Sequence, residues 1–234
     1  MTEAPPVTSL DWPEAHRIIS SRYPPVSLFE DIADPQDWDL IAGAESKTNP
    51  RLAESVGRLD LVPPGRRVAG PGASLVMAPF THVSPDWAGR FHDGTFGAYY
   101  AANRFETSVA ETAFHRGRFF RASRENPGWL TQLRHLIGSV NNDFHDLRRA
   151  EKFRDCLDPD SYNASQALAR RLRSDGANGL VYPSVRDPEG EVIAAFWPNV
   201  VGVPAPARHL AYHFDGERID LVRDEADGDV WRIV

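Results

Sequence analysis

Two short apolar runs in the middle of the chain, residues 74–80 and 98–102, predict buried strands. The stretch between them, residues 81–97, is rich in Gly, Pro and Asp, and it therefore predicts turns rather than a regular element. We expect the core of the fold to begin at Ala73, where the first of these runs starts.

After the second run, the spacing of apolar positions becomes helical. Residues 109–114 contain two i,i+4 apolar pairs that would face a core. Asn103 and Glu106 have the spacing of a capping box at a helix N-terminus. The pattern predicts a helix from about Arg104 to Arg116.

The last hundred residues continue the alternation of helix and strand. We expect strand and turn fragments over 130–147, a helix over 161–176 that stops at Gly176, a hairpin over 179–201 with its turn at Asp-Pro-Glu-Gly, a second hairpin over 209–222 and a final edge strand over 229–234. Strands mixed with helices and closed by hairpins are typical of an α+β fold.

The N-terminal part has a different character. It predicts a short helix that starts near Asp11 and ends at Pro24, followed by two helical pieces separated by Asp34-Pro35. A Pro/Gly-rich connector follows at 61–72. These features suggest a helical N-terminal extension and connector over 1–72, attached to a domain over 73–234 that contains the core.

Composition limits the possible classes of protein. The 234 residues suit one generous domain, with 41% hydrophobic and 25% charged residues. The formal net charge of −7 argues against nonspecific binding to nucleic acid, which needs a basic surface. No apolar run has the length of a membrane span, and the single cysteine, Cys156, fits a reducing compartment. We therefore expect a cytoplasmic protein without membrane or nucleic-acid partners.

Common motifs of metal and nucleotide sites are absent from the sequence. None of the eight histidines forms His-Glu-x-x-His or pairs with cysteines at zinc spacing, so no metal site is expected. The sequence has no Gly-x-Ser-x-Gly elbow, no Gly-x-Gly-x-x-Gly loop and no Walker motif. The familiar hydrolase and nucleotide-binding folds are therefore disfavoured.

Polar residues of potential chemical use gather between Phe80 and His115. Each has an ordinary alternative role: Tyr100 as a core aromatic residue, Glu111 on a solvated helix face and Arg90 in a surface salt bridge. His82 and Ser184 have the alternative of simple hydrogen bonding in loops. Tyr99 and Tyr100 alternate across their strand, so only one of them can face a site.

Four short motifs occur in order along this part of the chain. They are Gly89-Arg90-Phe91, Tyr100-Ala101-Ala102, Glu111 on the predicted helix, and Pro183-Ser184-Val185-Arg186, with Asn199 further on. This series resembles the RES domain family, over roughly residues 75–205. The resemblance implies a toxin of a bacterial toxin–antitoxin pair that consumes NAD+, with a core similar to ADP-ribosyltransferases. Many members have an Arg on the first core strand, where this chain has His82 near the predicted strand.

The resemblance also implies roles for these residues in breaking the nicotinamide–ribose bond of NAD+. Glu111 would stabilise positive charge on the ribose, and Tyr100 would stack on the nicotinamide. His82 would bind a ribose hydroxyl, and Arg90 would bind the pyrophosphate. Ser184 would position the ring or the incoming nucleophile.

Asn199 matches a further family position and would help to bind NAD+. The family also implies a cognate antitoxin protein that blocks the site. Water, phosphate or a target protein could accept the ADP-ribose, so both NAD+ degradation and ADP-ribosyl transfer stay open. A noncatalytic interaction protein with the same fold is the alternative.

Overall fold

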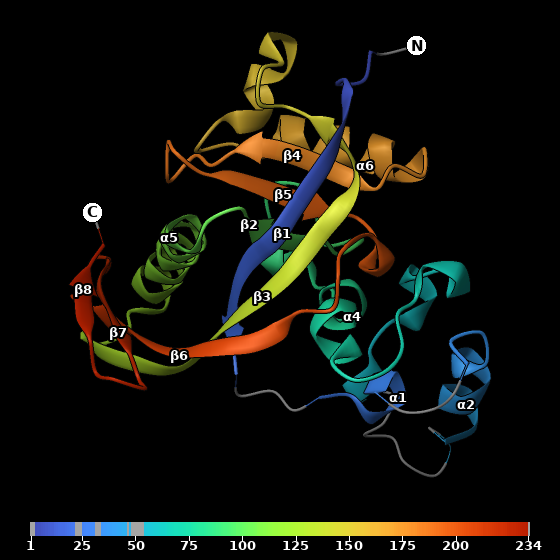
Figure 1. The fold of residues 1–234 in the computed structure, drawn as a ribbon, viewed down its shortest axis with the longest axis horizontal. Helices are drawn as coiled ribbons and strands as arrows, with labels where there is room; N and C mark the ends of the chain where they lie inside the picture. Colours follow the sequence, from blue (N-terminus) through green and yellow to red (C-terminus); the bar gives the residue numbers. More distant parts are fainter. Residues whose placement is uncertain (1–2, 22–24, 31–33, 46, 48–53, 234) are drawn as a thin grey trace.

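The computed structural model describes residues 3–21, 25–30, 34–45, 47 and 54–233, and shows an α+β domain built on one mixed sheet (Figure 1). Its strands are β1 (Val7–Ser20), β2 (Tyr99–Ala102), β3 (Gly128–Asp146), β4 (Gly179–Pro183), β5 (Glu191–Ala195), β6 (Ala205–Phe214), β7 (Ile219–Asp224) and β8 (Val230–Arg232). Its α-helices are α1 (Ser27–Glu30), α2 (Trp38–Glu45), α4 (Ala73–Thr81), α5 (Phe105–Ser123) and α6 (Asn163–Ser174). Short 3-10 helices are η1 (Leu59–Leu61), η2 (Pro64–Arg66), η3 (Pro85–Trp87), η4 (Glu151–Leu157) and η5 (Pro198–Val200).

The sheet has the strand order β1-β2-β5-β4-β3-β6-β7-β8, and an additional β1–β3 pairing closes its first five strands into a circuit. All pairings are antiparallel except β3–β4, which is parallel at His145 and Asp146. The strand β3 pairs with β1, β4 and β6, and Figure 1 shows β1 and β3 side by side across the molecule. The long β3 strand therefore joins the closed circuit to the β6–β8 extension.

The helix predicted near Asp11 is wrong, because this segment is the strand β1. Its backbone pairs with β3 along nearly its whole length, and this long-range partner is invisible in the local sequence. Pro13, which has no N–H to donate, falls in the register shift between Trp12 and Ala15. Residues 7–20 therefore belong to the sheet rather than to a helical extension, whereas α1 and α2 confirm the two helical pieces that follow. Pro24 lies outside the described residues.

The strand predicted over 74–80 is also wrong, because this segment forms the helix α4. A short, continuously apolar segment can be a buried helix as readily as a buried strand. Side chains on most sides of α4 are buried, including Ser74, Val76, Met77 and Phe80. Burial on most sides of the helix goes with a sequence that is apolar at nearly every position, which hides the amphipathic spacing of a helix.

The strand and turn fragments predicted over 130–147 are instead part of one continuous strand, β3. Gly138 lies within the ladder to β1, opposite Ala15. A Cβ at Gly138 would be 3.2 Å from the carbonyl oxygen of Gly202, so the glycine permits a close approach of two chain segments.

The helix predicted from Arg104 is confirmed as α5, which continues past Arg116 to Ser123. The capping box is wrong: Arg104 is the N-cap residue and its side chain makes no capping hydrogen bond. The Asn103 side chain instead accepts a hydrogen bond from the backbone N–H of Glu191 at 2.9 Å. Asn103 therefore ties the start of α5 to the start of β5.

The remaining C-terminal predictions are confirmed. The helix α6 is followed by Gly176 with a left-handed φ of 81°, as a helix stop requires. The pairs β4–β5 and β6–β7 are the two hairpins, and β8 is the final strand at the sheet edge. No helix within the described residues has the length and apolar character needed to cross a membrane.

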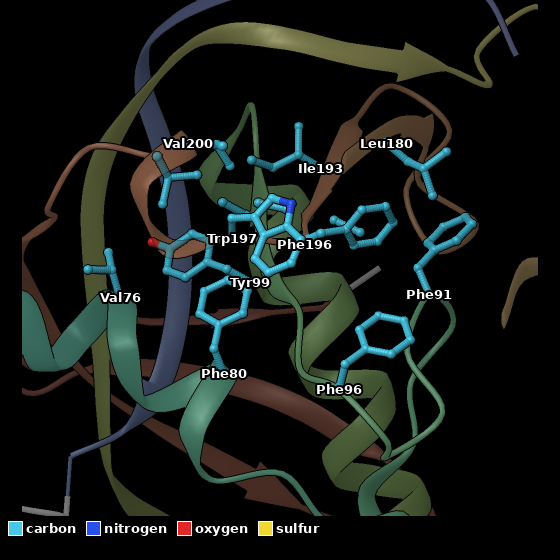
Figure 2. Close-up of a cluster of buried hydrophobic side chains, with 14 of the residues drawn as sticks. Val76, Phe80, Phe91, Phe96, Tyr99, Leu180, Ile193, Phe196, Trp197 and Val200 are labelled. Atoms are coloured by element: carbon cyan, nitrogen blue, oxygen red, sulfur yellow. The ribbon is translucent and has the colours of Figure 1, made fainter. Parts of the chain in front are cut away.

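Two hydrophobic clusters hold α4 and α5 to the sheet. In the first, Phe80 of α4 lies below Tyr99 of β2, near Phe196 and Trp197 (Figure 2). The second contains one face of α5 and the inner face of the β6–β7 hairpin, with Val109, Ala113, Phe120, Tyr212, Phe214 and Val222 among its members. This second cluster fixes the rotation of α5 and so decides which of its residues face away from the hairpin.

We expect Phe80→Ala to lower the free energy of unfolding by about 3–5 kcal/mol, because it removes a ring from a filled core. The Phe80 side chain is 2% exposed. Urea denaturation followed by circular dichroism measures this loss. Leu40→Ala is the control, since Leu40 is 75% exposed and its loss should change stability by no more than about 0.5 kcal/mol. Equal effects of the two substitutions would contradict the assigned core.

Candidate active site

The centre of the candidate site is a contact between Glu111 and Ser184, which are far apart in the sequence. The Ser184 hydroxyl donates a hydrogen bond to Oε1 of Glu111 at 2.6 Å. Glu111 lies on α5, and its side chain is 22% exposed. Ser184 follows directly after β4 and is buried. Two of the residues predicted from the sequence are therefore brought together.

Ser184 also organises the turn between β4 and β5. Its Oγ accepts hydrogen bonds from the backbone N–H groups of Arg186 at 3.1 Å and Asp187 at 3.0 Å. The backbone N–H of Ser184 donates to the carbonyl of Gly190 at 2.8 Å. The hydroxyl that contacts Glu111 is thus held by the turn on its other side.

The charge state of Glu111 is set by opposing effects. Burial is the largest effect, and it raises the pKa of the Glu111 carboxyl above its usual value. The Ser184 hydrogen bond and the positive charges of Arg186 and Arg90 act in the opposite direction. The net result is a carboxyl whose pKa is raised but whose ionised form still has specific partners.

His115 lies one helical turn after Glu111, with its Nε2 atom 3.9 Å from Oε2. Although 53% of its side chain is exposed, desolvation by its surroundings and the charges of Arg186, Arg118 and Arg90 lower the pKa of His115. At neutral pH the imidazole is therefore neutral and does not form an ion pair with Glu111. The i,i+4 spacing of Glu111 and His115 is the sequence signal that could have predicted this contact. It belongs to no metal-binding motif, so it was not singled out from the sequence.

Tyr100 lines the same region, whereas Tyr99 points into the core. Tyr99 is part of the first hydrophobic cluster, and the Tyr100 hydroxyl accepts a hydrogen bond from the backbone N–H of Phe91 at 2.9 Å. The Tyr100 ring centroid is 5.8 Å from that of His92. Burial raises the pKa of Tyr100, so its hydroxyl keeps its proton. Its ring, rather than an ionised hydroxyl, is what Tyr100 can offer to a ligand.

A small cavity of about 70 Å³ lies between β1, β2 and α5. Tyr100 and Glu111 both line it. Its other lining residues are His16, Arg17, Ile18, Ala101, Ala102, Ser108, Thr112 and Val192. A carboxylate, an aromatic residue and a guanidinium therefore share one cavity.

Arg17 on β1 was missed in the sequence because its segment was predicted to be a helix. Its guanidinium donates a hydrogen bond to the Tyr100 carbonyl at 2.8 Å and lies 4.5 Å from the centre of the Tyr99 ring. Its Nε is buried without a hydrogen-bond partner among the described residues. Arg17 therefore adds a guanidinium beside Tyr100 that no local motif of the sequence had indicated.

His82 is not on a core strand but at the C-terminal end of α4, where its side chain is exposed. Its Nδ1 is 3.2 Å from the hydroxyl of Thr81. Asn199 is likewise exposed, on η5. The hydrogen bonds described for the site connect neither residue to Glu111.

Arg90 is buried and already has partners. Its Nη1 donates to the carbonyls of Cys156 at 3.2 Å and Asp158 at 2.6 Å, and its guanidinium lies 4.8 Å from the centre of the Tyr162 ring. Through these hydrogen bonds, Arg90 holds η4 and the loop after it beside the site. Its positive charge also lowers the pKa of Glu111. Among the described residues, no cluster of three His, Cys, Asp or Glu side chains could hold a metal ion.

Comparison with known proteins identifies the class to which this fold and site belong. The RES domain matches residues 64–215, and the chain belongs to the RES domain family. A protein of Sinorhizobium fredii (strain NBRC 101917 / NGR234), "Uncharacterized protein y4oC", is 29% identical over 214 residues, which cover 89% of this chain and 86% of that protein. A chain in the crystal structure of the M. tuberculosis MbcT–MbcA toxin–antitoxin complex is similar with a TM-score of 0.42 and 12% identity, over 89% of this chain and 87% of that one.

We expect Glu111→Gln to stabilise the fold at neutral pH relative to wild type, because it removes a carboxyl whose pKa is raised by burial. A raised folded-state pKa means that wild type loses stability as the pH rises from the ordinary Glu pKa through the raised one. The difference in melting temperature between the two proteins should therefore be largest at neutral pH and should shrink below the ordinary Glu pKa. Thermal unfolding of both proteins across this pH range tests the prediction. A melting-temperature difference that grows on acidification would contradict it.

Proposed function

We propose that this chain is a RES-type toxin that breaks the nicotinamide N-glycosidic bond of NAD+. The observation that supports the proposal most directly is the shared cavity, in which the partly buried Glu111 carboxyl lies with Tyr100 and Arg17. The Ser184 hydrogen bond fixes the orientation of that carboxyl. The fold and family are compatible with this activity, and the experiments below test it.

The chemistry requires a stabilised positive charge on the sugar. As the C1′–N bond breaks, its electron pair stays with nicotinamide, which leaves as a neutral molecule, and the ribose gains oxocarbenium character. An ionised Glu111 stabilises that charge, and its burial strengthens the interaction by excluding water. A nucleophile then bonds to C1′ and releases a proton to the solvent.

The other residues would bind the dinucleotide. The Tyr100 ring offers a stacking surface for nicotinamide, and Ser184 keeps the Glu111 carboxyl in place. Arg17 lines the cavity and would bind a phosphate or hydroxyl oxygen there. Arg90 would contribute mainly through its charge, since its Nη1 is occupied by two carbonyls. His82 and Asn199 are exposed, and the contacts with NAD+ expected for them stay predictions.

The acceptor of ADP-ribose defines two versions of the activity. Transfer to water or phosphate would deplete NAD+, and transfer to a protein side chain would inactivate one target. We propose that either activity arrests growth in the cytoplasm, and that a cognate antitoxin protein blocks the cavity. Neither version needs a metal ion, because the charge on the sugar is stabilised by a carboxylate.

We expect the purified protein to release nicotinamide from NAD+, and Glu111→Gln to reduce the rate by at least about a thousandfold. The Gln side chain can still accept the Ser184 hydrogen bond, so the variant should stay folded. Chromatographic measurement of nicotinamide, with and without added phosphate or cell protein, gives the rate. Mass spectrometry of cellular protein for an ADP-ribose adduct separates transfer from degradation. If wild type releases no nicotinamide under any of these conditions, the noncatalytic alternative is favoured.

Arg17→Lys should weaken NAD+ binding while preserving the positive charge. Lysine cannot reproduce the planar guanidinium that contacts both the Tyr100 carbonyl and the Tyr99 ring. We expect KM for NAD+ to rise about tenfold or more, with a smaller change in kcat. Arg208→Lys is a matched control, since Arg208 is half exposed and lies beside the ring of Phe105. A variant at Arg17 with unchanged KM would remove this residue from the binding site.

A further inference from the structure

Two hydrogen bonds between side chains connect α5 to the turn between β4 and β5, one helical turn apart. The backbone N–H of Val185, in the same turn, also donates to the Glu111 carboxyl. Ser184 donates to Glu111 at 2.6 Å, and the Thr107 hydroxyl donates to Oδ2 of Asp187 at 2.5 Å. Thr107 and Glu111 are i,i+4 residues, so they project from the same side of α5. The helix therefore holds the turn at two points along one face.

The two contacts are linked through the Ser184 hydroxyl. A hydroxyl has one proton to donate and two lone pairs that accept. The backbone N–H groups of Arg186 and Asp187 both donate to Ser184 Oγ, and Glu111 receives its proton. One of those two N–H groups belongs to Asp187, the residue whose side chain Thr107 binds. A shift of Asp187 would therefore release one of the constraints that direct the Ser184 proton.

The contact between Thr107 and the turn is buried and tightly packed. Thr107 is fully buried, and a Cβ built at Gly190 would lie only 2.0 Å from its hydroxyl oxygen. The backbone N–H of Gly190 donates to the carbonyl of Asp187 at 3.0 Å, which closes the turn. A third contact, between Arg104 and Glu189 at 2.8 Å, is exposed to solvent. The burial distinguishes the Thr107–Asp187 contact from this surface ion pair, which solvent weakens.

We propose that Thr107 and Asp187 are positioning residues, which hold the turn so that Ser184 directs its proton at the Glu111 carboxyl. Neither residue touches the cavity of the candidate site, and both act through Ser184. The proposal rests on the proposed function for its effect on NAD+ cleavage, but the hydrogen-bonding relation can be measured without activity.

Thr107→Val tests most directly whether Thr107 supports the Ser184–Glu111 hydrogen bond, because valine keeps the shape of threonine and loses the hydroxyl. We expect about a tenfold fall in kcat for nicotinamide release with little change in KM, since the effect is on the orientation of Glu111. Thr107→Ser keeps the hydroxyl and should retain close to wild-type activity. Glu189→Gln, which removes only the exposed ion pair, is the control and should behave as wild type.

A double-mutant cycle with Ser184→Ala separates positioning from a general structural role. If Thr107 acts through Ser184, Thr107→Val should lower the rate in wild type and have little further effect in the Ser184→Ala background. A loss of equal size in both backgrounds would overturn the proposal. If Thr107→Val does not fold, Asp187→Ala removes the same hydrogen bond at a half-buried position and enters the same cycle.

NMR titration of the Glu111 side-chain carboxyl makes the test independent of catalysis. The Ser184 hydrogen bond lowers the pKa of Glu111, so the pKa should rise in Thr107→Val and stay as in wild type in Thr107→Ser. An unchanged pKa in Thr107→Val would refute the positioning role even if the protein cleaves NAD+. A raised pKa in a protein that releases no nicotinamide would support the relation and refute the proposed function.

Discussion

The pairing of β1 with β3 is the constraint on which the rest of the structure depends. It brings residues 7–20 beside a strand more than a hundred residues later and closes five strands into a circuit. The same β3 strand carries β6 on its other side, and the β6–β7 hairpin provides the apolar surface that holds α5. One long ladder thus sets both the position of Arg17 and the rotation of the helix that carries Glu111.

The candidate site places a destabilising group, the partly buried Glu111 carboxyl, beside two well-packed hydrophobic clusters. Burial of the Glu111 carboxyl costs free energy, which appears as its raised pKa. Ser184 and the neighbouring arginines offset part of that cost, and the cores on either side keep the helix and the strands from rearranging to expose the carboxyl. A carboxylate held out of water in this way interacts strongly with any positive charge that develops beside it.

Much of the site was predictable because its motifs are local. The strand at Tyr100, the helix bearing Glu111 and the hairpin after Ser184 were correctly predicted from spacing and turn residues, and the structure brings Glu111 and Ser184 into contact. His82 was associated with a core strand only because a short apolar run was assigned the wrong element. Arg17 was passed over for the converse reason, since its strand resembled a helix.

The sequence by itself determined the α+β class, the C-terminal hairpins and the family, because turn residues, helix spacing and short motifs act over a few neighbouring positions. The tertiary structure alone decided that residues 7–20 form a strand and that Arg17 meets Tyr100. It also decided that Thr107 binds Asp187 across the turn. These outcomes depend on partners distant in the chain, whose backbone and side-chain hydrogen bonds leave no mark on the local pattern of apolar and polar residues.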